Sequence, residues 1–160
     1  MYKTGHYGVA LVVYAPVGFL LSNVDPALSV LCGVAAVSLT PIPDVDHRIP
    51  FVAHRGSTHT MIFLFLVSGV LAGFGWTMAD VFGTDPAGTA VAGAIAGLVA
   101  IGSHLLADAL TPGGVPLLWP VSKERYAIGI SSASNPIANY GLFAVGIGVT
   151  MAVAFVAGGR

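Results

Sequence analysis

The sequence predicts an all-α fold: a polytopic membrane protein built as a bundle of about five transmembrane helices. Three observations lead to this fold class. Of the 160 residues, 56% are hydrophobic and only 8% are charged, whereas soluble domains carry about 25% charged residues. The mean hydropathy is +0.87. The apolar residues also gather into runs long enough to cross a bilayer, with Pro, Gly, Asp and Asn between them.

The first two apolar runs, 7–22 and 27–42, are short for membrane spans. A helix needs about 20 apolar residues to cross the hydrocarbon core of a bilayer. The runs also contain Pro16 and Pro41. We therefore expect these two helices to be tilted or to stop below one interface.

Three further runs reach the required length: 59–79, 88–111 and 139–157. The long connection 112–138 contains Trp119 and Tyr126, which are typical of a loop at the membrane interface. At this chain length we expect a single transmembrane helical domain over residues 1–160.

The basic residues predict the orientation of the bundle. Five spans would place the N-terminus and the connections 43–58 and 112–138 on the same side of the membrane. That side holds all but one of the basic residues, namely Lys3, Arg48, Arg55, Lys123 and Arg125, and the other side holds Arg160. The positive-inside rule then places the N-terminus in the cytoplasm. We expect a multi-pass protein of the cell (plasma or inner) membrane, with the lipid bilayer as its partner.

The same side collects the histidines and several acids. These residues are His6 before the first span, Asp44, Asp46 and His47 after the second, His54 in the loop, His59 at the start of the third, and His104 with Asp108 near the end of the fourth. All five histidines and three of the six aspartates thus lie at one membrane face. Helix ends that are far apart in sequence should meet there.

His104 and Asp108 are four residues apart, so they lie on one face of a helix. His104 is expected about 10 Å below the helix end, at 1.5 Å per residue. Imidazoles and carboxylates at that depth are costly unless they are paired, and a bound metal ion would offset the cost. Neutral imidazole and carboxylate oxygen suit zinc, and also manganese or iron. The sequence therefore predicts a metal site of one or two ions at the cytoplasmic helix ends.

Simpler interpretations of the single residues stay open. Asp44 alone could be a solvated loop acid, His6 an interfacial histidine, and Arg48 and Arg55 topology anchors. Other chemistries have less support, because the sequence has no G-x-S-x-G, H-E-x-x-H or P-loop motif. The six basic residues are scattered, so we expect no nucleic-acid partner.

Three blocks of sequence resemble a known family: LTPIPDVDH, HRGSTHT and SHLLADALTPGGVPLLWP. They are similar to the signature blocks of the YdjM-like family of membrane-associated metal-dependent hydrolases. The resemblance covers most of residues 1–120, whereas 121–160 match only as a loop and a final span. It implies a distant similarity to the zinc-dependent phospholipase C and single-strand nuclease superfamily.

The order of metal ligands in that superfamily is matched here by His6, by Asp44 or Asp46, by His59, and by His104 with Asp108. No histidine follows His104, so at most two of the three metals of that superfamily could be retained. Five residues precede His6, which departs from the use of the N-terminal amine as a ligand in the superfamily.

The residues and the resemblance together predict metal-assisted hydrolysis of a phosphoester, with a lipid or lipid-linked substrate suggested by the location. The expected first site is Asp44, His59, His104 and Asp108, and Asp108 would bridge to a second metal held by His6 and Asp46. Four residues are expected to take part in catalysis: Asp46 as a base or as a group that orients a histidine, His47 beside it, and His54 and Arg55 facing the phosphoryl charge.

The geometry of the two neighbouring acids is a separate expectation. After Pro43 we expect extended chain, in which residues two apart point the same way, so that Asp44 and Asp46 reach the same centre or two adjacent ones. Two functions from other classes stay open. One is a structural or regulatory membrane protein whose metal only holds helix ends together, and the other is a metal carrier.

Overall fold

The computed structural model describes residues 1–48 and 55–159. In this part of the chain the protein is all-helical, and its α-helices are α1 (Lys3–Ser22), α2 (Pro26–Leu39), α3 (Met61–Phe82), α4 (Pro86–Ala109) and α5 (Pro136–Gly158). Two 3₁₀ helices, η1 (Ile42–Arg48) and η2 (Ser57–His59), lie between α2 and α3. Five helical segments are long and apolar enough to cross a membrane, the second running over Pro26–His47. The predicted fold class is confirmed.

Short capping sequences determine where three of the helices begin. Each starts with Asp or Asn at the N-cap and proline at the next position. The cap side chains of Asp25, Asp85 and Asn135 accept hydrogen bonds from backbone N–H groups three residues on, at 3.0, 2.8 and 3.2 Å. Such caps stabilise a helix by about 1 kcal/mol each. Because the caps precede the apolar runs, α4 and α5 begin two and three residues before their predicted starts.

The predicted second span, 27–42, differs from the structure at its end, because α2 stops at Leu39. Pro41 and Pro43 have no N–H group and cannot continue the α-helical hydrogen bonds. The chain instead tightens into η1, whose Asp44 N–H donates to the Pro41 carbonyl at 3.1 Å. The expectation of extended chain after Pro43 was therefore wrong.

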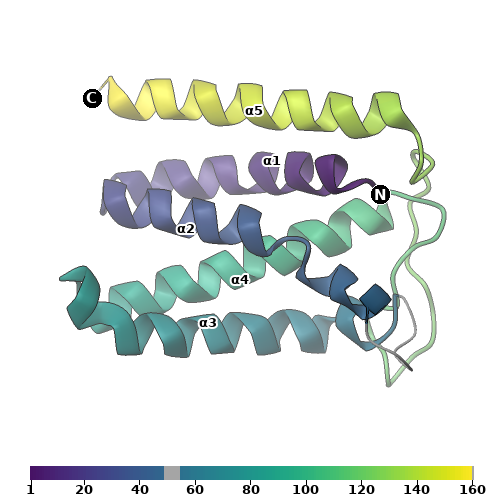
Figure 1. Cartoon of the computed structure of the whole chain (residues 1–160), viewed down its shortest axis with the longest axis horizontal. Coiled ribbons are helices and arrows are strands. Elements are labelled where there is room, and N and C mark those ends of the chain that lie inside the picture. The colour runs from purple at the N-terminus through teal and green to yellow at the C-terminus, as the bar shows by residue number, and fades with distance from the viewer. Residues whose placement is uncertain (49–54, 160) are drawn as a thin grey trace.

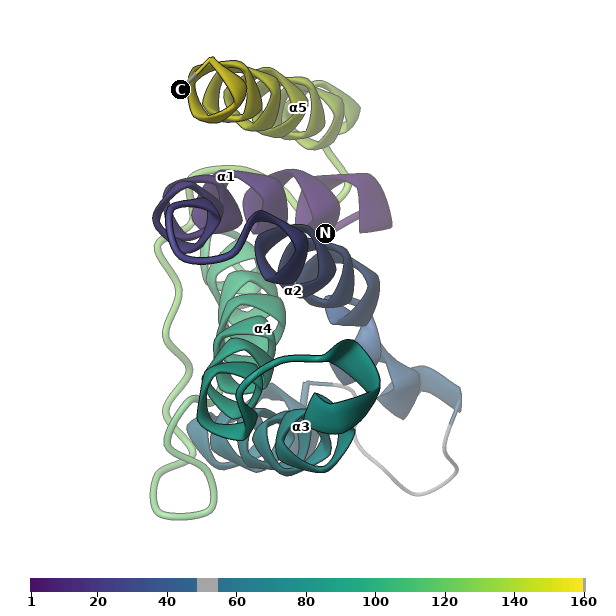
Figure 2. The same ribbon diagram turned by 90° about the vertical axis from the view of Figure 1, so that its left-hand side faces the viewer.

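Helix α4 lies at the centre of the bundle, where it contacts α3, α2 and α1, and α5 packs on the opposite side of α1. Figures 1 and 2 show the helix axes roughly aligned, with α5 at one edge of the bundle and α3 at the other. The start of α1, the start of α3 and the end of α4 all lie at the same end of the bundle, whereas the C-terminus lies at the opposite end (Figure 1). This arrangement gathers the polar residues at one end, which we call the site end.

Glycines allow α3 and α4 to approach closely. A Cβ atom built on Gly93 would lie 2.2 Å from the Leu71 carbonyl oxygen, and one on Gly75 would lie 2.3 Å from the Thr89 carbonyl oxygen. Both are backbone atoms that cannot move independently of their helix. Small residues of this kind let helices pack in lipid, where van der Waals contact replaces the hydrophobic effect. The close packing of α3 on α4 therefore depends on these two positions.

We expect Gly93→Leu to lower the free energy of unfolding in mild detergent by about 1–3 kcal/mol, the usual cost of overpacking. The matched control is Gly73→Leu, because a Cβ at Gly73 has nothing within 4 Å. Thermal unfolding followed by circular dichroism would measure both variants. Equal stability of the two would contradict close packing at Gly93.

Candidate metal centre

The site end brings together side chains from four segments. His6 comes from α1, Asp44 and Asp46 from η1, His59 from η2, and His104 and Asp108 from α4. Five of these side chains are exposed by 2% or less, while the side chain of Asp44 is 25% exposed. Two predicted positions differ slightly from the structure. His6 lies inside α1 rather than before it, and His59 precedes α3 rather than opening it.

Two histidine nitrogens of this group each lie near a carboxylate oxygen of both Asp44 and Asp108. The Nε2 atoms of His59 and His104 are 3.2 Å apart. Asp44 Oδ1 lies 3.7 Å from the first of them and 3.6 Å from the second. Asp108 Oδ2 lies 3.6 and 3.8 Å from the same two atoms. Two imidazole nitrogens and two carboxylate oxygens, all potential metal ligands, thus face one another.

These separations fit a small divalent cation. Ligand atoms 2.0–2.2 Å from a tetrahedral zinc ion lie roughly 3.3–3.6 Å from each other. The five separations above run from 3.2 to 3.8 Å, which is close to that spacing and long for direct hydrogen bonds. Buried carboxylates and imidazoles are also costly without a partner. Asp44, His59, His104 and Asp108 could therefore hold one ion.

Asp46 lies on the other side of the His59 ring. Its Oδ2 is 3.4 Å from His59 Nδ1, and it accepts hydrogen bonds from the Thr58 hydroxyl at 2.9 Å and the Arg55 N–H at 3.0 Å. The same Thr58 hydroxyl lies 2.9 Å from His59 Nδ1, and an acceptor there favours the tautomer whose Nε2 lone pair is free to bind a metal. In a 3₁₀ helix residues two apart differ in direction by about 120°. For this reason Asp44 reaches Nε2 of His59 while Asp46 reaches Nδ1.

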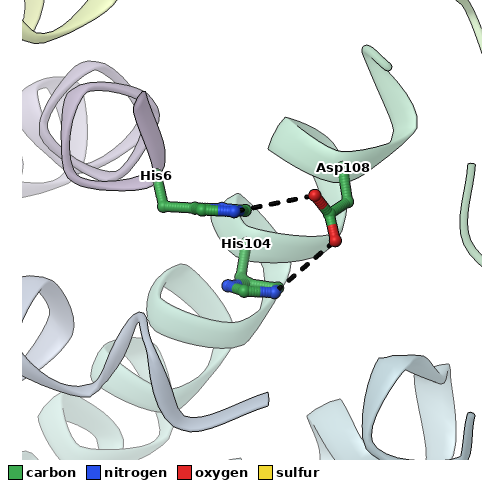
Figure 3. Close-up of side chains that lie close together, drawn as sticks. All are labelled: His6, His104 and Asp108. Carbon is green, nitrogen blue, oxygen red and sulfur yellow. Dashed lines mark ion pairs between the residues drawn. The ribbon is translucent and has the colours of Figure 1, made fainter. Parts of the chain in front are cut away.

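His6 adds a third imidazole beside the four-atom group. Its ring stacks on that of His104, with centroids 4.0 Å apart and planes at 6°. Figure 3 shows the two rings side by side, with His6 directed at one oxygen of Asp108 and His104 at the other. The first of these contacts joins His6 Nε2 to Asp108 Oδ1 at 3.6 Å, and the Met1 amine lies 3.2 Å from the same oxygen. His6, His104 and Asp108 thus form a second group of potential ligands.

The remaining predicted residues have different surroundings. Arg55 donates from Nη2 to Asp108 Oδ1 at 2.8 Å, and its predicted contact with a phosphoryl group stays a prediction. His47 is exposed, and one of its ring nitrogens lies within 4.8 Å of carboxylate oxygens of Asp44 and Asp46. His54 lies outside the described residues.

The sequence reasoning did not identify the residues that hold the end of α4 in place. The backbone N–H of Ile128 donates to the Ala109 carbonyl at 2.7 Å, and that of Ile130 donates to the Leu110 carbonyl at 2.8 Å. The loop after α4 thus returns to satisfy carbonyls that a helix end leaves free. Only the interfacial character of this loop was visible in the sequence, because backbone hydrogen bonds leave no motif.

A second missed residue is Asn139, which is buried at the start of α5. Its side-chain oxygen accepts the Tyr2 N–H at 2.9 Å, and its nitrogen donates to the carbonyls of Ala133 and Asn135 at 3.1 and 2.7 Å. These bonds attach the N-terminus, and with it the start of α1, to the chain before α5. A polar residue near the start of an apolar span was the available signal.

Fold and site together define an all-helical membrane protein with potential metal ligands gathered at one end of its bundle. The family model described as "YdjM inner membrane protein" matches residues 1–158. The chain belongs to this family, as the sequence blocks predicted. It is similar to the inner membrane proteins YdjM of Escherichia coli K12 and Shigella flexneri, with 35% identity over 108 residues in each case.

That match covers 54% of this chain and 47% of each relative. The chain thus spans about half the length of the curated relatives it matches. No solved structure matches the chain.

Proposed function

We propose that this protein is a metal-dependent hydrolase embedded in the inner membrane, which cleaves a phosphoester in a lipid or lipid-linked substrate. The observation that carries the proposal is the geometry of two histidines and two aspartates. The Nε2 atoms of His59 and His104 are 3.2 Å apart, and each lies 3.6–3.8 Å from a carboxylate oxygen of both Asp44 and Asp108. Zinc suits this donor set best, and manganese or iron would also fit it.

A metal in this place would lower the pKa of a bound water to about 7 and polarise a phosphoryl oxygen. The protein's own groups have distinct tasks around it. Asp46 orients His59 through the Thr58 hydroxyl, which donates to Asp46 Oδ2 and lies 2.9 Å from His59 Nδ1. His47 is exposed at the rim beside Asp44 and Asp46, so it is placed to exchange a proton with water. An imidazole suits that task because its two ring nitrogens can accept and donate a proton.

The location supports a substrate that belongs to the membrane. The ligands lie at the ends of apolar helices, and the segments around them carry exposed apolar side chains such as Val45 and Leu118. A phosphoester whose remainder lies in the bilayer would present its head group at this level. The chain matches only 47% of each curated relative, so the substrate of the whole protein is likewise part of this proposal.

A second candidate is a protein whose metal only holds the helix ends together. One consideration favours it: if all four residues bound the ion, they would complete a tetrahedral shell, which is typical of structural zinc, whereas catalytic zinc keeps a position for water. The partial exposure of Asp44 favours the hydrolase, because a ligand at the rim can make way for water. A metal carrier has less support, since the groups of potential ligands found among the described residues all lie at the site end.

The central test is metal content together with turnover. Purified in mild detergent without chelator, the protein should contain one or two transition-metal ions per chain, and His59→Ala and His104→Ala should each remove most of that metal. The wild type should hydrolyse at least one member of a panel of phosphodiesters and phospholipids, and the variants should not. If the wild type contained no more metal than the two variants, the proposed metal site would be wrong. If it contained metal but hydrolysed no substrate, the structural candidate would be favoured.

Substitutions of the two acids of η1 should affect metal binding to different extents. We expect Asp44→Asn to lose metal and activity together, because Oδ1 faces both Nε2 atoms. Asp46→Asn should weaken metal binding by about 10–100-fold, the usual effect of changing a partner of a metal-binding histidine, and should lower activity. Competition with a chelating dye would measure both affinities. Wild-type affinity and turnover in both variants would mean that neither acid serves the centre.

The orientation in the membrane can be tested by labelling. Lys123→Cys lies in the loop at the site end, and Val24→Cys lies in the turn at the other end, where Val24 is 82% exposed. A membrane-impermeant maleimide should reach position 24 from outside intact cells and position 123 only after the cells are opened. Cys32 is buried and should stay unlabelled. The reverse pattern would place the site on the external face.

A further inference from the structure

Arg55 has a backbone conformation that its residue type disfavours. Its φ is +55°, and among the described residues it alone has a positive φ without being glycine. The left-handed region costs a residue with a Cβ atom roughly 1–2 kcal/mol. Outliers of this kind persist where surrounding contacts fix them, and they cluster at functional sites. Glycine at this position would avoid the conformational cost of a positive φ. The presence of arginine instead indicates a role for its side chain.

That side chain reaches into the site end. Nη2 donates to Asp108 Oδ1 at 2.8 Å, and Nη1 donates to the Gly114 carbonyl at 3.3 Å. The backbone N–H of the same residue donates to Asp46 Oδ2 at 3.0 Å. Arg55 thus contacts both acids that flank the histidine pair, one through its main chain and one through its guanidinium group.

The contacts of Asp108 divide between its two oxygens. Oδ2 faces His59 and His104 at 3.6 and 3.8 Å, whereas Oδ1 takes the guanidinium of Arg55 and lies 3.6 Å from His6. The Arg55 bond at 2.8 Å and the Met1 amine at 3.2 Å both keep Oδ1 turned away from the histidine pair. Asp108 is thereby held so that it offers one oxygen, not two, to the histidine pair.

The same contacts argue against a second ion. A metal bridged by Asp108 would need Oδ1, and it would lie beside a fixed positive charge whose repulsion is weakly screened in a buried site. The two ligand groups that contain buried histidines, His6–His104–Asp108 and Asp44–His59–His104, also share His104. A neutral imidazole has one nitrogen lone pair, so both groups cannot be filled at once.

We propose that Arg55 is a positioning residue that turns Asp108 toward the histidine pair and occupies the place of a second cation, so that the centre binds one ion. This inference rests on the proposed metal site and reduces the expected number of bound ions from one or two to one. Arg55 acts here on Asp108 rather than on the substrate.

The chain offers a matched control. Arg125 also donates to the Gly114 carbonyl, from Nη2 at 3.2 Å, and its Nε donates to the Gly113 carbonyl at 2.9 Å. Arg125 therefore shares the structural part of Arg55's contacts without the bond to Asp108. Arg55→Gly is a useful second variant, because glycine suits a positive φ and should fold without backbone strain.

Cobalt titration tests the proposal without relying on activity. Wild-type protein in detergent, cleared of metal, should bind one equivalent of Co²⁺ with the visible absorption of a tetrahedral centre. Arg55→Gln and Arg55→Gly should bind it about 10–100-fold more weakly, Arg55→Lys should recover part of that loss, and Arg125→Gln should match the wild type. Arg55→Gly should still unfold cooperatively, because relief of the backbone strain offsets part of the cost of the lost bond to Asp108.

The outcomes separate this inference from the proposed function. Two equivalents in the wild type, or full affinity in both Arg55→Gln and Arg55→Gly, would overturn the role of Arg55 and leave the metal centre standing. An equal loss in Arg125→Gln would show that the 113–114 turn matters rather than the bond to Asp108. No binding in the wild type, as in His59→Ala, would overturn the metal site and this inference together.

Discussion

The structure of the site end depends on the burial of the Asp108 carboxylate. Asp108 is 1% exposed in a helix that otherwise carries mostly apolar residues, and a buried carboxylate is costly unless positive or hydrogen-bonding groups surround it. Those groups cannot come from α4 alone, because only His104 lies one turn away. His6 from α1, His59 from η2 and Arg55 from the preceding loop supply them. Burial of the Asp108 carboxylate thus requires that segments distant in sequence meet at this end of the bundle.

Two other features keep that convergence in place. Backbone bonds from Ile128 and Ile130 close the end of α4, so that Asp108 does not move with a fraying helix terminus. Asn139 attaches Tyr2 to the chain before α5 and so sets where α1 begins, which determines the depth of His6. The close approach of α3 and α4 through glycine then keeps η2, just before α3, at the level of the last turns of α4. Packing in the apolar part of the bundle therefore controls distances at its polar end.

Much of this could be read from the sequence, and the failures have physical reasons. The spans follow from apolar run length, and His104 with Asp108 follows from helical spacing. The shape of 42–48 did not follow, because two prolines suit both extended chain and a 3₁₀ helix, and the hydrogen bond from Asp44 to Pro41 decides between them. The extended geometry expected for Asp44 and Asp46 was wrong for that reason. The bond from Arg55 to Asp108 was not foreseen, since a positive φ and a tertiary contact leave no sequence pattern.

The difference between a structural and a reactive centre comes down to Asp44. The three residues proposed to bind the ion with Asp44 are at most 1% exposed, and two of them lie on the long helix α4. Asp44 instead lies on a seven-residue 3₁₀ helix, and its side chain is 25% exposed. Short 3₁₀ helices have poorer hydrogen-bond geometry than α-helices, so a shift of this carboxylate costs less than a shift of any other ligand. In the proposed hydrolase, water and substrate therefore reach the ion from the side of Asp44, where His47 is also exposed. A protein that used the metal only to hold its helices together would gain nothing from placing its least constrained ligand at a partly exposed position.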